Sequence, residues 1–452
     1  MTKQKGEKAF GLFGAAMLGI GSMVGAGIFI VIGQAGAIAG NIVWLSFVFG
    51  GIAALLSGYS LAKLALRYPS RGGIVEYLVQ GYGEGVFSGS ASVLFYLAGL
   101  VSIAAVAKSF GTYAATFLHA TNDPLWVNLF AVGIVALFTL INLLGASSVA
   151  KSENLIVVVK VTVLAVFAAA ALFTVDPANL SIAEMPPFRN MLFAIGLTFF
   201  AYQGFSVITN TVEDMRDPGR TMLRAMVLAI LAVALLYIVT SVAVLGNLSL
   251  ADVIRTKDYA LAEAARPVFG DLGFKVMAAT ALLATASAIN AALYATTEIG
   301  YTMAKEGTMP KNYEYNVFHS YEGLIISALL ILPMILFFDL AQVTTVAALS
   351  VLIIQGITHV GHLLRIRQTE ANRWLVLAAA LSMFAIAGLT LEYTMHHAPA
   401  IGYDMLGAFA LSFGIEITLR LLNRRVVTRQ VRDLFTLGNR YDSGTKKKSS
   451  ED

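Results

Sequence analysis

Residues 10–40 read FGLFGAAMLGIGSMVGAGIFIVIGQAGAIAG, a stretch of the chain without a charged side chain. A helix needs ~20 apolar residues to cross the ~30 Å hydrocarbon core of a bilayer, so this stretch is long enough to span a membrane. Its middle contains Gly19, Gly21, Gly25 and Gly27. Because one glycine already weakens a helix interior by ~1 kcal/mol relative to alanine, the stretch predicts a membrane-spanning helix that is interrupted near its centre.

Similar apolar stretches recur along the 452 residues, which are 58% apolar and only 13% charged. The mean hydropathy is +0.75. A soluble protein of this size needs more charge to cover its surface, which excludes a large cytosolic enzyme, a nucleic-acid-binding protein and a disordered chain. We predict an all-α integral membrane protein, with residues 1–423 as one transmembrane domain and residues 424–452 as a basic cytoplasmic tail. Its twelve predicted spans are 11–38, 42–66, 86–118, 125–145, 153–175, 189–215, 221–246, 272–304, 323–339, 342–364, 373–395 and 400–422.

The distribution of lysine and arginine predicts the orientation of the spans. An even number of spans places both termini on one side, and cytoplasmic loops carry an excess of basic residues. We therefore predict a multi-pass protein of the cell membrane with both termini in the cytoplasm and an N-terminal stretch that is retained rather than cleaved. The net charge of +4 then marks orientation rather than an anionic partner such as a nucleic acid. With this orientation the external side contains only Arg189, Arg255, Lys257, Arg266 and Lys275.

The sequence lacks the residue patterns of the common metal and catalytic sites. It contains no cysteine, and its six histidines show no metal-ligand spacing such as HExxH. The predicted spans contain no cluster of His, Asp and Ser that would form a catalytic site. We therefore predict that the protein is not an enzyme and uses no metal or organic cofactor. No obligatory protein partner is evident.

The glycine-rich centre of the first span has three interpretations. A dinucleotide-binding loop would follow a strand and precede an acidic residue about twenty positions on, and the sequence offers neither. A helix-packing seam would use Gly21 and Gly25, which are four residues apart. A discontinuous helix would instead expose backbone N–H groups that bind an anionic ligand group at the membrane midplane.

The sixth span, residues 189–215, favours the discontinuous helix. It contains Tyr202, Gln203, Gly204 and Asn210 among apolar residues. Polar groups at this depth cost free energy in lipid unless they face a partner or a cavity. Spans one and six begin two five-span halves, 1–5 and 6–10, and matching interruptions in two repeats indicate a transporter site at the repeat interface. The alternative is that these polar residues only join adjacent helices.

One lysine, Lys160, lies deep within the fifth span. It follows Glu153 by seven residues, which at ~1.5 Å per residue places it ~10 Å from the predicted cytoplasmic end. At that depth its amine should face protein or water rather than lipid. Burial disfavours the charged amine, so such a lysine can load and release a proton as its access to water changes. Alternatively, it is a permanently charged structural residue held by helix-end carbonyls.

Three segments together resemble one transporter family. They are GIGSMVGAGIF at Gly19–Phe29, FFAYQGFSVITNTVEDMRDPGRTMLRA at Phe199–Ala225 and YTMAKEGTMPK at Tyr301–Lys311. Their order and spacing are similar to those of the amino acid–polyamine–organocation (APC) permeases over nearly the whole chain. The resemblance is closest to archaeal and bacterial proton-coupled amino acid permeases with a lysine in span five, which Lys160 matches. It implies two inverted five-helix repeats plus two peripheral helices, with spans one and six discontinuous.

The same resemblance implies a substrate site at the centres of spans one and six. In this family an aromatic residue, here Phe200, closes over the substrate, and a lysine, here Lys160, takes the place of a sodium ion found in sodium-coupled relatives. The lysine is then expected near the backbone of Gly19 and the hydroxyl of Ser287. Ala26 stands where many members have serine, which removes one hydroxyl contact. The implied donors to the substrate carboxylate are the N–H groups of Gly25, Ala26 and Gly27, and the implied acceptors for its ammonium are the carbonyls of Met23, Phe200 and Gln203.

Together, these observations and the resemblance predict secondary active transport of free L-amino acids across the lipid bilayer by alternating access. No acidic side chain lies at the centre of either interrupted segment, so neutral amino acids of broad choice are the expected substrates. Proton-coupled symport is the predicted mechanism, with the proton as the coupling ion. An exchanger or facilitator with a structural Lys160, or an amino acid sensor on the same fold, is the alternative.

Overall fold

The computed structural model describes residues 11–70, 72–121, 123–145, 148–181, 186–305 and 307–422, so the predicted basic tail lies outside the described residues. Each of the twelve predicted spans contains a helix. These helices are α1 (Leu12–Ala39), α2 (Val43–Arg67), α4 (Val86–Thr116), α5 (Pro124–Leu144), α6 (Ser148–Ala171), α7 (Phe188–Tyr202) with the 3-10 helix η4 (Gln203–Asp214), α8 (Pro218–Asn247), α10 (Ala260–Lys305), α11 (Glu322–Phe337), α12 (Leu340–Leu364), α14 (Arg373–His397) and α15 (Pro399–Leu422). Shorter elements connect them, namely η1 (Gly40–Ile42), α3 (Ile74–Tyr82), η2 (Pro177–Leu180), α9 (Leu250–Arg255), η5 (Lys311–Glu314), β1 (Asn316–Val317), β2 (Ser320–Tyr321) and α13 (Ile366–Thr369).

The lengths and hydropathies of these helices confirm an all-α membrane protein. Within the described residues, nine helical segments are long and apolar enough to cross a membrane. Three shorter apolar helices, Leu12–Gly25, Leu155–Ala171 and Glu322–Phe337, occupy the positions of spans one, five and nine. In α10 the helix is interrupted at Gly270, where φ is +67°, so its membrane-spanning part begins after this residue, as the predicted boundary requires.

The helices of the first half and the second half make equivalent contacts. α1 packs against α8, and its counterpart α7 packs against α2; α6 packs against α10, and its counterpart α12 packs against α4. The contact pattern is therefore retained when the helices of spans 1–5 are exchanged with those of spans 6–10, as two structural repeats require. Because each half has an odd number of spans, the second half crosses the membrane in the opposite direction and the repeats are inverted.

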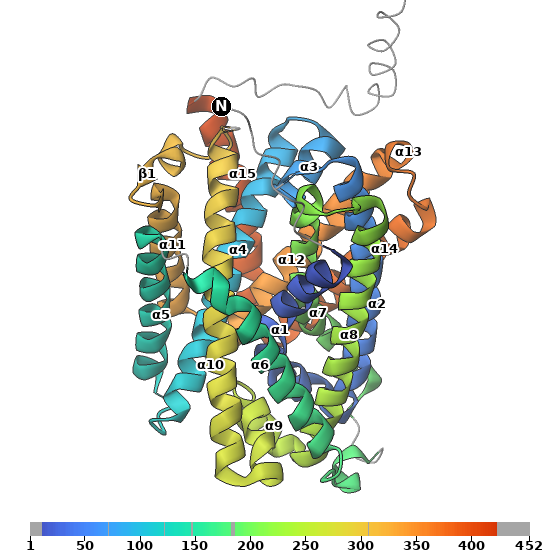
Figure 1. The fold of residues 1–452 in the computed structure, drawn as a ribbon, viewed down its shortest axis with the longest axis vertical. Helices are drawn as coiled ribbons and strands as arrows, with labels where there is room; N and C mark the ends of the chain where they lie inside the picture. The colour runs from blue at the N-terminus through green and yellow to red at the C-terminus, as the bar shows by residue number, and fades with distance from the viewer. Residues whose placement is uncertain are drawn as a thin grey trace, which may run out of the picture.

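The bundle places α1 and α7 near its centre, with α5, α11 and α14 at its edges (Figure 1). One end of the bundle, which we call the α3 end, carries α3, α13, the hairpin β1–β2 and the C-terminal end of α15. The opposite end, which we call the α9 end, carries α9.

The predicted interruption is found in span six, whereas span one differs from the expectation. α7 ends at Tyr202, and the chain continues as the 3-10 helix η4 from Gln203. α1 runs as one helix from Leu12 to Ala39, so the structure does not show the predicted break at its glycines. The glycines instead allow neighbouring helices to approach the backbone of α1, and tertiary packing stabilises the helical conformation that glycine alone disfavours.

At the α9 end, the segment that precedes α10 packs against α1. A Cβ atom at Gly33 would collide with the carbonyl oxygen of Lys257, so this segment lies directly on α1. The next residue on each side is polar, Gln34 on α1 and Asp258 in the segment. The Gln34 side chain is only 4% exposed, and its amide lies beside the partly buried Asp258 carboxyl group. Burial raises the pKa of Asp258 above its ordinary value, and Lys257 and Gln34 offset this effect only in part.

We expect Asp258→Asn to raise the thermal unfolding midpoint, Tm, at neutral pH. A carboxyl group whose pKa is raised by folding binds its proton more tightly in the folded chain, so stability falls as the pH rises from below its ordinary pKa through the raised value. The amide removes this penalty, so the variant should exceed the wild type in Tm at about pH 7 and match it at about pH 4.

Asp252→Asn is the matched control, with the opposite sign. The Ser249 hydroxyl, followed by Arg255, holds the pKa of this exposed carboxyl below its ordinary value. Its replacement should therefore lower the Tm slightly at neutral pH. A Tm difference for Asp258→Asn that does not change with pH would contradict the prediction.

Candidate functional site

α1 meets the α7–η4 junction backbone to backbone at two points. A Cβ atom at Gly27 would lie 2.5 Å from the carbonyl oxygen and 2.8 Å from the Cα of Ala201. A Cβ atom at Gly204 would collide with the backbone nitrogen of Met23 and the carbonyl carbon of Ser22. Side chains do not approach a backbone this closely, so both positions require glycine. The fold thus brings together the two segments in which the substrate site was predicted.

The three carbonyls predicted to accept a substrate ammonium already accept hydrogen bonds. Tyr237 of α8 donates its hydroxyl to the Met23 oxygen at 2.7 Å. The Ser206 hydroxyl donates to the backbone carbonyl oxygen of Gln203 at 3.1 Å, and the backbone N–H of Gln203 donates to the carbonyl oxygen of Phe200. A carbonyl oxygen has two lone pairs, and the Met23 oxygen uses both, one for Tyr237 and one for the N–H of the next turn of α1, so a substrate ammonium has to displace a donor that is already bound there. The structure therefore holds this site in a closed arrangement whose acceptors are satisfied internally.

The predicted carboxylate donors, Gly25, Ala26 and Gly27, lie within the continuous helix α1. Helical hydrogen bonds use their N–H groups, so a substrate carboxylate reaches them only after α1 opens locally. Gly25 faces α10 and α6, because a Cβ atom there would lie 3.2 Å from the Ala288 Cβ and 3.8 Å from the Lys160 Nζ. The side chain of Ala26 lies outside the described part of the structure.

Lys160 of α6 is 1% exposed, and its Nζ donates to the Gly21 carbonyl oxygen at 2.8 Å. The expected contact was with Gly19, which instead faces η4 and α8, where a Cβ atom would meet Ile208 and Ala229. Successive residues of a helix are rotated by ~100°, so a shift of two residues turns the backbone toward a different neighbour. Ser287 is also buried, and it precedes the Ala288 that borders Gly25. α1, α6 and α10 therefore meet at this lysine.

The predicted lid residue, Phe200, is 8% exposed and belongs to the hydrophobic core. It directly precedes Ala201, whose backbone touches Gly27. Phe200 thus lies at the contact of α1 with α7, in the region where the resemblance expects the substrate.

Two residues of this region were not anticipated from the sequence. The Tyr237 hydroxyl also lies 3.2 Å from the Ala201 oxygen, so it links α8 to both α1 and α7. Gln355 of α12 donates from Nε2 to the Gln203 side-chain oxygen at 2.7 Å. Both are polar residues in apolar spans, a pattern that indicates a buried polar partner. The pattern was visible in the sequence, but it does not identify the partner.

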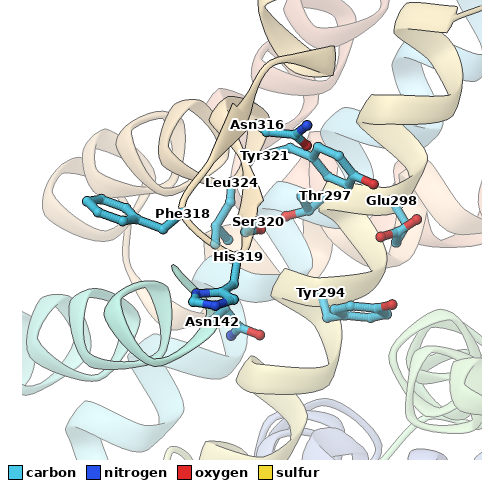
Figure 2. Close-up of a pocket in the computed structure, with 10 residues that line it drawn as sticks. All are labelled: Asn142, Tyr294, Thr297, Glu298, Asn316, Phe318, His319, Ser320, Tyr321 and Leu324. Carbon is cyan, nitrogen blue, oxygen red and sulfur yellow. The ribbon is translucent and has the colours of Figure 1, made fainter. Parts of the chain in front are cut away.

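A cavity of about 370 Å³ lies apart from these contacts. It is formed at the α3 end by α5, α10, the hairpin β1–β2 and the start of α11, and Figure 2 shows Asn142, Glu298 and Tyr321 among the side chains around it. None of the predicted site residues lines it. The candidate site is therefore defined by the contacts of α1 with α7, η4 and α6 rather than by this cavity.

Comparison with known proteins identifies the family of this bundle. A family model described as "Amino acid permease" matches residues 10–406. The chain belongs to the amino acid permease family. This permease is 39% identical over 350 residues to the inner membrane transport protein YbaT of Escherichia coli strain K12, which covers 77% of this chain and 81% of YbaT. It is 30% identical over 428 residues to the uncharacterised protein MJ0609 of Methanocaldococcus jannaschii, which covers 94% of this chain and 98% of that protein. It is 27% identical over 315 residues to the serine/threonine exchanger SteT of Bacillus subtilis, which covers 67% of this chain and 70% of SteT.

Family membership confirms the resemblance seen in the three sequence segments. Relatives of the permease are named as transporters, and its helices are those of a multi-pass membrane protein. The chain is therefore an amino acid transporter of the APC superfamily rather than an enzyme.

Proposed function

We propose that this permease is a proton-coupled symporter that carries neutral amino acids of broad choice between α1 and the α7–η4 junction. The observation that carries the proposal is the contact of the buried Lys160 amine with the Gly21 carbonyl, about one turn of α1 from Gly25. A dry site disfavours a charged lysine, so water that enters at this contact changes its protonation. Because Lys160 touches the helix that would bind the substrate, proton exchange and substrate binding act on the same element.

The chemistry of the contact supports a zwitterionic substrate. Its acceptors are the carbonyls of Met23, Phe200 and Gln203, and its donors are N–H groups that become available when α1 opens at its glycines. Each glycine lowers the stability of the helix by ~1 kcal/mol relative to alanine, so this opening is easier here than in an ordinary helix. Backbone groups hold a carboxylate and an ammonium without selecting a charged side chain, which supports neutral amino acids.

We also propose that the α3 end faces the cytoplasm. The basic residues near this end include Lys63, Arg67 and Lys311, and cytoplasmic loops carry the excess of such residues. The α9 end is then external, and the 370 Å³ cavity lies on the cytoplasmic side.

Uptake into proteoliposomes tests the function directly. A panel of radiolabelled neutral, acidic and basic amino acids is measured at two external pH values, with and without an inward proton gradient. We expect several neutral amino acids to accumulate above their external concentration only when the gradient is present. Equal accumulation with and without the proton gradient would reject the proposed proton coupling.

An exchanger is the second candidate, because one relative of the chain is named a serine/threonine exchanger. In that case Lys160 would be a structural residue. Uptake would then require an amino acid inside the vesicles and would not require a proton gradient. Preloading the same proteoliposomes with unlabelled amino acid separates the two mechanisms.

We expect Phe200→Ala to raise the apparent KM for uptake by about tenfold, because a ring that closes over the substrate contributes on the order of 1.4 kcal/mol. Phe199→Ala is the control, since Phe199 is completely buried and packs edge-on against Phe205. The control should lower the Tm more than it changes KM. Wild-type KM for a well-folded Phe200→Ala protein would remove the role of Phe200 as a lid.

A further inference from the structure

A row of hydrogen-bonded polar side chains runs between α2 and α12, starting at the α7–η4 junction. We call this row, which consists of Gln203, Gln355, Ser57 and His359, the polar file. Gln355 donates from Nε2 to the Gln203 side-chain oxygen at 2.7 Å, and its own oxygen accepts from the Ser57 hydroxyl at 2.6 Å. The Ser57 Oγ also lies 2.8 Å from Nε2 of His359. Ser57, Gln355 and His359 are completely buried. The candidate substrate site is thus connected to an imidazole through two hydrogen-bonded side chains.

A second pair lies one turn closer to the α3 end. The Ser60 Oγ lies 2.8 Å from Nδ1 of His362, and Nε2 of His362 lies 2.8 Å from the Thr369 Oγ1. Residues three apart lie on the same face of a helix, so Ser57 and Ser60 face the two histidines as successive pairs. The two pairs differ in how completely the ring nitrogens are satisfied.

The hydroxyl donors fix the position of the proton on each imidazole. Ser57 has one hydroxyl hydrogen and donates it to Gln355, so it must accept from Nε2–H of His359. The Nδ1 atom of neutral His359 is therefore a bare acceptor, and it is buried without a hydrogen-bond partner among the described residues. This nitrogen is basic and unoccupied, but burial disfavours a charged imidazolium, so Nδ1 can bind a proton only when water reaches it.

His362 is different, because both of its nitrogens are satisfied when the ring is neutral. Thr369 donates its hydroxyl to the Ile366 oxygen, so it accepts from Nε2–H of His362. Nδ1 then accepts from Ser60. This imidazole has no free acceptor for a further proton.

The charged and titratable groups around the two imidazoles are few in the described residues. His362 acts on His359, and Lys63 of α2 acts on His362. On α3, Tyr82 donates to the Ile357 oxygen of α12. On α15, Glu416 and Arg420 form an ion pair with each other. A proton on His359 would therefore be felt mainly by its own hydrogen-bond partners.

The polar file has a counterpart in the first repeat. α6 is the fifth span of the first half, and its Lys160 donates to α1, the first span of that half. α12 is the fifth span of the second half, and its Gln355 donates to Gln203 at the start of η4, in the first span of that half. In each repeat a polar side chain of the fifth helix holds the first helix near its middle. One of these contacts includes a titratable amine, and the other leads to a titratable imidazole.

We infer that His359 is a second proton-binding site of this permease, linked to the substrate site through Ser57, Gln355 and Gln203. The inference rests on the proposed transport of amino acids at the α1–α7 contact. When the α3 end opens to water, a proton from water binds the Nδ1 lone pair and gives an imidazolium, and it returns to water when Nδ1–H dissociates. The Nε2–H bond to Ser57 stays in place, and it becomes a charge-assisted hydrogen bond while the ring is protonated. Its strengthening acts on Gln355 and, through it, on Gln203.

The test compares His359→Gln with His362→Gln in the purified full-length protein. A glutamine amide can still donate to Ser57 but cannot bind the proton. Calorimetric titration with L-alanine in two buffers of different ionisation enthalpy gives the number of protons exchanged on binding. The slope of log Kd against pH, measured between about pH 5.5 and 7.5, gives the same number independently. We expect His359→Gln to exchange fewer protons on binding than the wild type. Its Kd should therefore change less with pH, by up to a factor of ten less per pH unit. His362→Gln should keep the wild-type slope.

Each other outcome overturns the inference. An unchanged proton number in His359→Gln would show that Nδ1 does not titrate with binding, and equal losses in both variants would show that the polar file is structural. If His359→Gln does not fold, Ser57→Ala breaks the link to Gln355 and should flatten the slope in the same way; a wild-type slope in that variant rejects the link. Wild-type protein that binds L-alanine without any pH dependence rejects the second proton site while leaving transport intact. Wild-type protein that neither binds nor transports any amino acid of the panel rejects the proposed function and this inference together.

Discussion

Lys160→Arg is expected to abolish proton-driven accumulation of substrate while the protein stays folded. Arginine keeps a positive charge and can donate to the Gly21 oxygen, but it practically never releases its proton. If the proton must leave this position in each cycle, the variant is locked in one protonation state. We expect its accumulation ratio in proteoliposomes with an inward proton gradient to fall at least about tenfold, toward the ratio of one that passive equilibration gives.

The control for this variant is Lys275→Arg, because Lys275 is an exposed residue of α10 that makes no part of the α1 contact. It should accumulate substrate as the wild type does. Lys160→Ala removes the amine and the bond to Gly21 together, so a loss of uptake in that variant does not separate coupling from structure. A Lys160→Arg protein with an unaltered response to the proton gradient would establish a structural lysine and favour the exchanger.

Gly27→Ala is expected to cause the second large effect, namely the loss of substrate binding. The added methyl group would lie 2.5 to 3.0 Å from the backbone oxygen, Cα and carbonyl carbon of Ala201, which move only if α7 moves away from α1. Overpacking of this kind costs about 1–3 kcal/mol, and here the strain falls on the two elements that form the site. We expect the Kd for a neutral amino acid to rise at least about tenfold, with a lower Tm.

Gly25→Ala is the matched variant, two residues away on the same helix. Its methyl group would lie 3.2 Å from the Ala288 Cβ, which needs a shift of only a few tenths of an ångström, and 3.8 Å from the Lys160 Nζ, which is an ordinary contact. This variant keeps the backbone N–H and should weaken binding much less than Gly27→Ala, by no more than the ~1 kcal/mol that alanine adds to the stability of the helix. If Gly27→Ala and Gly25→Ala bind equally well, the close approach of α7 to α1 plays no part in substrate binding.

The spans and the class of fold could be predicted because hydropathy alone decides whether a segment can cross a bilayer. All twelve predicted segments contain helices, and the boundary of span eight coincides with the backbone break at Gly270. The change of helix type at Gln203 could also be predicted, because polar residues and glycine gather there in an apolar segment. These properties depend on the local sequence and on the solvent, not on the neighbouring helices.

The exact contacts of the site depend on helix rotation, which an almost uniformly apolar sequence does not specify. Gly19 and Gly21 are both glycines in the same span, yet the Gly21 carbonyl accepts from Lys160, whereas Gly19 faces Ile208 and Ala229. The continuity of α1 likewise depends on packing, since intrinsic propensity favours a break at its glycines. The partners of Tyr237 and Gln355 are distant in the sequence, so each could be recognised only as a polar residue that needed a partner.

The hydroxyl of Tyr237 occupies the place that a substrate ammonium would need at the Met23 oxygen. A substrate that displaced it would replace one hydrogen bond by another, so the net gain would be the difference between a charged and a neutral donor. Such modest affinity favours release of the cargo on the far side. In the proposed cycle the tyrosine would also keep the Met23 and Ala201 oxygens hydrogen-bonded in the unloaded carrier, which would ease the return of the empty protein. An exchanger depends on blocking that empty return, and the bond from Tyr237 removes one of the barriers that would block it.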